Sequence, residues 1–342
     1  MKTEEAEAAA EDEVWTADAI KEIYKSLFDN KMNAEEEAVA ADIIMCCASC
    51  GQAEIDDIKL KKCACNLVKY CSDNCMANHR PDHEEECKKG LDKLRERELF
   101  EQPDSSHYGE CPICCLPLSL DPLKSTMSGC CSNMICNGCN YANQKRENEA
   151  GLKRRCAFCR ELVPESEEEY DKNVMERIKK NDPVALREEG IRDCNVGDYK
   201  TAIKYLTKAA ELGDAIAHFE LSGLYLNGEG VNKDAEKEYY HLEQAAIGGH
   251  PIARHNLGCM EAEIAGWSGR YERAKKHWII AANLGFEDSL KNVKDLYAHG
   301  DASKEDYFNA LRAYQAAVDA TKSSERERAE QAMKNGEVRN LF

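Results

Sequence analysis

The sequence predicts a mainly α-helical chain in which two small cysteine-rich modules are followed by a solenoid of helical hairpins. Two observations carry this prediction. Seventeen of the 19 cysteines lie between Cys46 and Cys159, and beyond them an Ala-Ala-x-x-Gly pattern recurs every 36 residues, beginning at Ala209, Ala245 and Ala281. The length of 342 residues allows two or three domains, because single cores stop growing at about 250 to 300 residues.

Charge and hydropathy narrow the classes of partner. The chain has 64 acidic and 46 basic residues and a net charge of -18. This balance disfavours binding to nucleic acid, which depends on clustered Lys and Arg. The sequence contains no run of about 18 apolar residues, and its acidic beginning lacks the basic and apolar stretches of a signal peptide. We therefore expect protein partners, no membrane contact, and a location in the cytoplasm, the nucleus or both.

The spacing of the cysteines indicates metal binding. In a chain without an export signal, a reducing compartment favours metal thiolates over disulfides. Buried thiols that act as small hydrophobic side chains are the alternative. Paired Cys-x-x-Cys spacing argues against that alternative, because a loop of two or three residues brings neighbouring ligands to two vertices of a zinc tetrahedron.

The first module, residues 46–87, carries eight candidate ligands, enough for two tetrahedral zinc sites. They are Cys47, Cys50, Cys63, Cys65, Cys71, Cys75, His83 and Cys87. Their order resembles the MYND finger, in which two cysteine pairs precede Cys-x-x-x-Cys and His-x-x-x-Cys. The resemblance implies that one zinc ion is held by Cys47, Cys50, Cys71 and Cys75, and the other by Cys63, Cys65, His83 and Cys87. His79 is the alternative to His83, and Cys46 is a spare thiol.

The second module, residues 108–164, also carries eight candidate ligands. They are Cys111, Cys114, Cys130, Cys131, Cys136, Cys139, Cys156 and Cys159. This spacing resembles a RING, and Asn133 stands where many RINGs have a histidine, as in an all-cysteine RING. The resemblance implies a cross-brace: one zinc ion on Cys111, Cys114, Cys136 and Cys139, the other on Cys130, Cys131, Cys156 and Cys159. It also implies a short helix after Cys139 and a total of four zinc ions per chain.

The RING resemblance implies a function without a covalent catalytic residue. A RING ubiquitin ligase binds a ubiquitin-conjugating enzyme and holds the ubiquitin thioester in a reactive pose, which is catalysis by positioning. By resemblance, Ile113 contacts the conjugating enzyme and Arg160 hydrogen-bonds both that enzyme and ubiquitin. The alternatives are that Ile113 packs locally and that Arg160 is a solvated charge.

Two other functions stay open beside a ubiquitin ligase or ligase subunit. The module has no tryptophan between Cys139 and Cys156, and Ala157 replaces a proline that active RINGs commonly have. These departures favour a non-enzymatic scaffold or adaptor. Transcriptional regulation through the first module is the third hypothesis.

The repeated segment predicts stacked helix pairs from residue 184 to residue 320. Small residues permit close helix packing, and the glycine after each Ala-Ala pair supplies a left-handed turn that ends a helix. The same 36-residue register aligns Leu221, Leu257 and Val293 as core positions. The phrase AAELGDAIAHFELSGLYLNGEGV resembles a unit of the Sel-one-like repeats, which are relatives of the tetratricopeptide repeats.

The remaining segments complete the predicted organisation. The Glu/Ala-rich beginning has too little apolar surface to fold, and 165–172 is highly charged, as in a linker. The expected segments are a disordered acidic tail at 1–13, a helical lead-in at 14–45, a linker helix at 88–102, a charged linker at 165–172 and a charged C-terminal helix or tail at 321–342. The predicted fold is thus mainly α, with two cross-brace zinc-binding modules before an α-solenoid.

Overall fold

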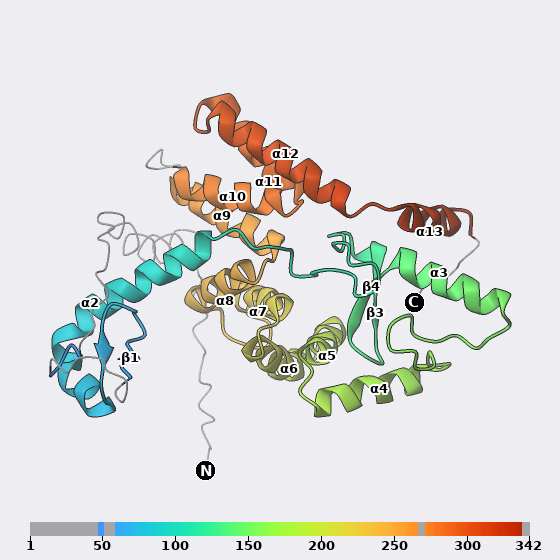
Figure 1. Ribbon diagram of the computed structural model, residues 1–342, viewed down its shortest axis with the longest axis horizontal. Coiled ribbons are helices and arrows are strands. Elements are labelled where there is room, and N and C mark those ends of the chain that lie inside the picture. Colours follow the sequence, from blue (N-terminus) through green and yellow to red (C-terminus); the bar gives the residue numbers. More distant parts are fainter. Residues whose placement is uncertain (1–46, 51–58, 266–270, 337–342) are drawn as a thin grey trace, which may run out of the picture. The chain divides into compact units, whose positions relative to one another are not determined.

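The computed structural model describes residues 47–50, 59–265 and 271–336 (Figure 1). The expected acidic tail, the helical lead-in and Cys46 lie outside these residues. Helices make up most of the described part, which confirms the mainly α-helical fold class. None of the described helices is both long and apolar enough to cross a membrane. The chain divides into two units, residues 1–93 and 94–342, and each is described by itself.

The first unit is built on one short hairpin and one long helix. Strands β1 (Lys61–Lys62) and β2 (Lys69–Tyr70) pair antiparallel. Helix α2 (Asp73–Phe100) follows at once, and the Ser72 hydroxyl accepts a hydrogen bond from the Cys75 N–H at its start. The linker helix expected at 88–102 is therefore not a separate element. It is the end of α2, because Gly90 alone costs a helix only about 1 kcal/mol, and no proline lies between Gly90 and Pro103.

The second cysteine-rich module combines a hairpin with a helix. A 3-10 turn, Pro122–Lys124, precedes β3 (Ser125–Ser128), which pairs antiparallel with β4 (Asn133–Cys136). Helix α3 (Asn137–Glu149) starts directly after β4, and the Cys136 sulfur accepts a hydrogen bond from the Cys139 N–H. Leu118 and Ile135 form the core of this module together with its cysteines.

The segment 165–172 is mostly helical, so the expected charged linker is wrong. Helix α4 (Glu167–Lys179) begins after Ser166, whose hydroxyl accepts a hydrogen bond from the Glu169 N–H. Three glutamates lie in the first turn, near the positive end of the helix dipole, and their negative charges stabilise the helix there. Val174 and Ile178, one turn apart, bury the apolar face of α4 against the first repeat.

Eight helices form the repeat region. They are α5 (Pro183–Val196), α6 (Tyr199–Glu211), α7 (Ala215–Asn227), α8 (Ala235–Ile247), α9 (Pro251–Ala265), α10 (Glu272–Asn283), α11 (Glu287–His299) and α12 (Lys304–Ala320). Each packs against the next in sequence, as in a solenoid (Figure 1). Leu221, Leu257 and Val293 are at most 1% exposed, as the repeat register predicts. Gly213, Gly249 and Gly285 have φ angles of +88°, +79° and +91°, the left-handed conformation expected after each Ala-Ala pair.

The last described segment is a helix that returns to the second cysteine-rich module. Helix α13 (Ser324–Lys334) packs against α3, and both lie at the right of Figure 1. Ala329 and Ala332 are buried on its inner face. The backbone of Arg326 lies where a side chain on Gly138 would be, so the two helices approach closely. Of the two forms expected for residues 321–342, the described part therefore takes the helical one.

Candidate metal centres

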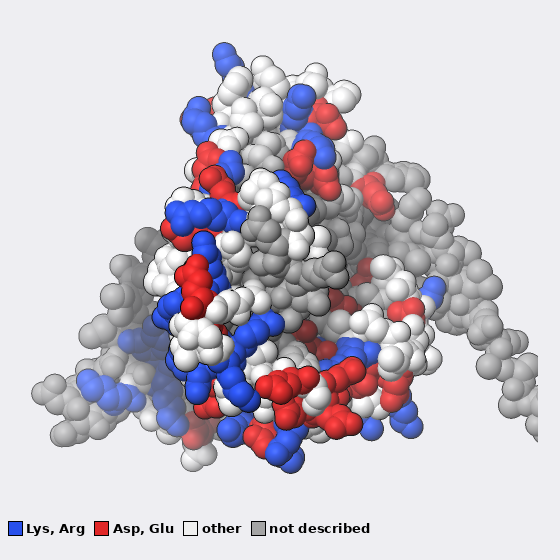
Figure 2. Space-filling view, turned by 90° about the vertical axis from the view of Figure 1, so that its right-hand side faces the viewer, with Lys and Arg blue, Asp and Glu red and all other residues white. Residues whose placement is uncertain are grey.

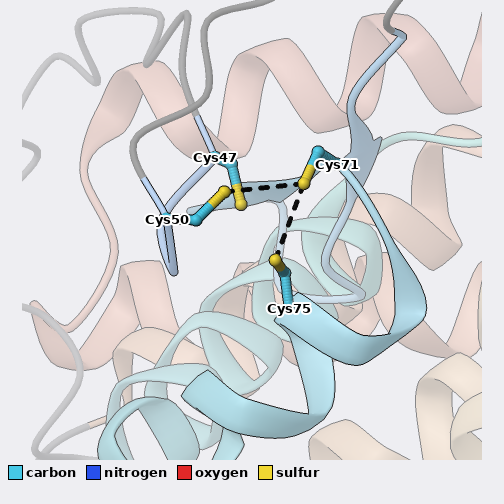
Figure 3. A group of neighbouring side chains, drawn as sticks. All are labelled: Cys47, Cys50, Cys71 and Cys75. Atoms are coloured by element: carbon cyan, nitrogen blue, oxygen red, sulfur yellow. Dashed lines mark hydrogen bonds between the residues drawn. The ribbon is translucent and has the colours of Figure 1, made fainter.

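The first four-ligand group joins the turn at 47–50 to the beginning of α2. The thiols of Cys47, Cys50, Cys71 and Cys75 point toward one another (Figure 3). The sulfur of Cys71 lies 3.6 Å from those of both Cys50 and Cys75. A zinc tetrahedron with bonds of about 2.3 Å has sulfur–sulfur edges of about 3.8 Å, whereas a disulfide bond is about 2.05 Å long. The geometry thus fits four thiolates around a metal.

The second group joins the loop after β1 to the middle of α2. Its ligands are Cys63, Cys65, His83 and Cys87. His83 and Cys87 are one turn apart, so both point from the same face of the helix. The His83 Nε2 lies 3.2 Å from the Cys65 sulfur, and the Cys63 and Cys87 sulfurs are 3.5 Å apart. The other histidine considered, His79, instead has its Nδ1 3.0 Å from the Tyr70 hydroxyl and stacks on the His83 ring.

The third and fourth groups interleave along the second module. The third contains Cys111, Cys114, Cys136 and Cys139, and the fourth contains Cys130, Cys131, Cys156 and Cys159. Sulfur–sulfur distances are 3.8 Å for Cys114–Cys136, 3.3 Å for Cys130–Cys159 and 3.9 Å for Cys131–Cys156. The third group therefore ties the beginning of the module to its middle, and the fourth ties the middle to the end, across more than 20 residues in each case. These four groups contain the sixteen ligands that the two resemblances imply.

The thiols of the first and third groups differ in pKa. Burial raises the pKa of Cys47. Hydrogen bonds from the backbone N–H groups of Cys71, Cys50 and Ser49 outweigh this effect and lower the pKa to about 6. A hydrogen bond from Cys136 lowers the pKa of Cys111 to about 4. In contrast, the hydrogen bond that Cys71 makes to Cys75 raises the pKa of Cys71 to about 12, and burial raises that of Cys139 to about 12. In these two groups the thiols of Cys71 and Cys139, whose pKa is raised, lose their protons more readily when a positive charge lies at the centre.

The donor set fits zinc. Each cluster offers four donor atoms within 4.8 Å of one another. All are thiols except the imidazole of His83 in the second group. Thiolate with imidazole in a closed tetrahedral set is the typical structural zinc site. All cysteines in the described residues are free of disulfides. The chain therefore has four clusters suited to zinc, and Cys115, which is exposed, belongs to none of them.

The two candidate partner-binding residues lie in different surroundings. Ile113 is 41% exposed between the first two ligands of the third group. Arg160 is held against α3, with Nη2 2.9 Å from the Glu147 carboxylate and Nη1 donating to the Asn143 side chain at 2.7 Å. Glu147 is 1% exposed and also accepts a hydrogen bond from the Arg155 N–H. Arg160 is therefore not the freely solvated charge of the alternative interpretation.

Arg326 is a residue at this site that sequence reasoning missed. Its guanidinium, from α13, donates to the carbonyl oxygens of Leu116 and Pro117 and lies 3.5 Å from the Cys114 sulfur. It places a positive charge beside the ligands of the third group. No sequence signal predicts this contact, because Arg326 lies more than 200 residues from Cys114.

Charges on the side of the second unit where α3 and α13 lie are mixed. Figure 2 shows this side, on which both basic and acidic side chains are visible and neither sign covers the whole face. Within the second module, the Lys153 ammonium lies 3.5 Å from the carboxylate of Glu165. Any partner that contacts this side meets charges of both signs.

Comparisons with known proteins identify two kinds of module. Residues 47–87 match the MYND finger family, and three consecutive segments, 186–214, 215–250 and 251–286, match the Sel1 repeat family. A solved Sel1 repeat protein from Oxalobacter formigenes is 28% identical, over 36% of this chain and 96% of its own, with a TM-score of 0.31. A search of curated proteins found no match. The chain therefore contains a MYND finger and Sel1 repeats, and it is a zinc-binding protein-interaction protein.

Proposed function

We propose that the chain is a RING-type ubiquitin ligase or a ligase subunit. In this proposal, residues 108–164 recruit a charged ubiquitin-conjugating enzyme, and the MYND finger and the Sel1 repeats hold the substrate. The observation that carries the proposal is the interleaved order of the third and fourth ligand groups, with β3, β4 and α3 between them. This is the cross-brace order of a RING.

Two features of the surface support a docking role for this module. Ile113, between the ligands Cys111 and Cys114, keeps 41% of its surface exposed, and Phe158, between the last two ligands, is 46% exposed. Apolar side chains that remain exposed on the two ligand loops offer a contact to a protein partner. Arg160 is 43% exposed in its side chain while Glu147 fixes its orientation, as suits a group that contacts a partner in one pose.

A non-enzymatic scaffold is the second candidate. The hydrogen bonds of Arg160 to Glu147 and Asn143 favour it, because they use donors that a ligase needs for the conjugating enzyme and ubiquitin. Under this alternative, the second module only binds proteins, like the MYND finger and the repeats. Arg160 then has a structural role in neutralising the buried Glu147.

Ubiquitin discharge from a panel of charged conjugating enzymes tests the proposal. We expect the purified chain to accelerate discharge with at least one enzyme, and Ile113→Ala to remove most of this acceleration. Leu152→Ala is the matched control, since Leu152 is an exposed leucine of the same module outside the ligand loops. Absence of discharge with every enzyme, from protein that contains four zinc ions, would leave the scaffold.

Arg160 needs a second substitution in its test. Arg160→Ala alone leaves the carboxylate of Glu147 buried without its counter-charge, which is destabilising in itself. The double variant Arg160→Ala/Glu147→Gln removes both charges, and Glu147→Gln alone is its control. For a ligase, discharge falls in the double variant and remains in the control. Equal activity of the two variants, with zinc content unchanged, would remove Arg160 from the mechanism.

A further inference from the structure

The end of helix α2 is bound by the Sel1 repeats of the same unit. Residues 94–100, the docked segment, contact α8, α9 and α10 in turn. Arg95 pairs with Glu243 of α8, and Glu96 pairs with Arg273 of α10. Leu99 between them is completely buried. The docked segment thus supplies the basic partner of one ion pair, the acidic partner of the other, and a buried leucine between them.

Arg254 of α9 hydrogen-bonds the backbone at the end of the docked segment. Its guanidinium donates to the carbonyl oxygen of Leu99 and, at 2.7 Å, to that of Ala246. The last carbonyl groups of a helix have no partner within the helix and carry the negative end of its dipole. Arg254 therefore recognises a helix C-terminus as such, whatever the side chains there.

Phe100 adds an aromatic contact on the same surface. Its ring lies 4.7 Å from that of His277, and the Arg273 guanidinium lies over it at 4.8 Å. The Lys276 ammonium lies 5.2 Å from the same ring. A cation over the face of an aromatic ring is attracted by the ring's π-electrons. The surface thus favours an aromatic side chain at this position over an aliphatic one of similar size.

The receiving surface contains charged and polar side chains that are buried. Glu243, Arg254 and His277 are completely buried, and burial lowers the pKa of Arg254 to about 10 and that of His277 to about 4. The Nε of Arg254 and the Nδ1 of His277 have no hydrogen-bond partner within the described residues. A solenoid packs through small and apolar residues, as the Ala-Ala positions do here. Glu243 and Arg273 pair with Arg95 and Glu96 of the docked segment, and Arg273 also pairs with Glu261 of α9. Charge pairs between a segment and the surface that receives it are typical of recognition.

We propose that the surface formed by Glu243, Arg254, Arg273 and His277 is a peptide-recognition site for a helix end with the order Arg-Glu-x-x-Leu-Phe. Residues 95–100 occupy this site within the chain, and a protein partner with the same order competes with them. A tethered segment acts at an effective concentration of the order of millimolar. Partners of this surface therefore bind the intact chain only when the docked segment leaves.

A labelled peptide with the sequence of residues 88–102 tests the proposal on the full zinc-loaded chain. Two variants, Leu99→Asp and Phe100→Ala, weaken the docked segment, and circular dichroism checks that their helices remain. We expect fluorescence anisotropy to show at least about tenfold tighter peptide binding by the folded variants than by the wild type. Two variants keep the test valid if Leu99→Asp does not fold.

Peptide variants provide the matched controls without changing the protein. Leu99→Asp in the peptide removes the buried anchor and is expected to abolish binding. The double change Arg97→Ala/Glu98→Ala alters two residues that are exposed in the docked segment, so it leaves binding within about twofold. Two results would overturn the proposal. In the first, the folded protein variants Leu99→Asp and Phe100→Ala bind the peptide no more tightly than the wild type does. In the second, they bind the Leu99→Asp peptide as well as the unchanged peptide. The assay involves no ubiquitin, so its outcome is independent of ligase activity.

Discussion

The zinc modules and the Sel1 repeats reach a folded state by different means. In the MYND finger the described core has only Leu60 and Tyr70 beside a ligand, Cys47. The first repeat instead buries a continuous cluster that includes Leu186, Leu206 and Leu221. Modules of about 40 to 60 residues rarely fold on their own apolar surface, whereas repeats add stability from neighbour to neighbour. Metal therefore determines folding in the first case, and helix packing in the second.

Removal of zinc is expected to give the largest separation between the two regions. Structural zinc contributes about 10 to 16 kcal/mol per site in isolated zinc-finger peptides. Chelation under reducing conditions is expected to unfold residues 47–93 and 108–164 and to leave α5 to α12 helical. Hydrogen exchange measured by mass spectrometry follows both regions in one sample. Simultaneous loss of protection in the repeats would show that the solenoid also depends on the metal.

Removal of one ligand is expected to have the next largest effect. Cys131→Ser takes one thiolate from the fourth group, so the zinc content falls from four to about three ions per chain. Cys115→Ser is the matched control, because Cys115 is the exposed neighbour of a ligand and belongs to no group. Elemental analysis of reduced, folded protein measures both. Equal zinc content in the two variants would contradict the assignment of Cys131.

A core substitution in the repeats is expected to be smaller and local. Leu257 of α9 is completely buried, and a Leu→Ala change at such a site costs about 2 to 5 kcal/mol. Leu226→Ala, at a leucine that is 50% exposed, is the control. We expect denaturant unfolding of Leu257→Ala to show this loss in the free energy of unfolding of the repeats, while the protein still contains four zinc ions. Loss of zinc from Leu257→Ala would show that the two regions are not separate in stability.

The sequence predicts best what depends on local spacing. Ligand pairs two or three residues apart reveal a metal site because the metal fixes their geometry. The Ala-Ala-x-x-Gly pattern reveals the helix pairs because close packing demands small residues at a fixed interval. Both signals lie within a few residues, so they are readable without the fold.

Contacts between distant segments leave no such signal. Arg160 looks like an ordinary surface arginine until the fold brings it to Glu147, and Arg326 reaches Cys114 from the last described helix. Helix α4 was missed for another reason: its glutamates dominate the composition. The spacing of Val174 and Ile178 is the signal that predicts its buried face.

The smallest expected effect is a pH dependence in the repeats that comes from His250. Its Nδ1 accepts a hydrogen bond from the Ala253 N–H at the start of α9, and its ring stacks on His107 and Phe219. Burial lowers the pKa of His250 to about 2, compared with about 6.5 in the unfolded chain. Below pH 6.5 the unfolded chain therefore binds a proton that the folded chain does not, and stability falls by about 2 kcal/mol between pH 7 and pH 5. His250→Asn keeps a cap without this titration. We expect hydrogen exchange of α9 to show about 2 kcal/mol less pH dependence in His250→Asn, and equal dependence in both proteins would assign the effect to other groups.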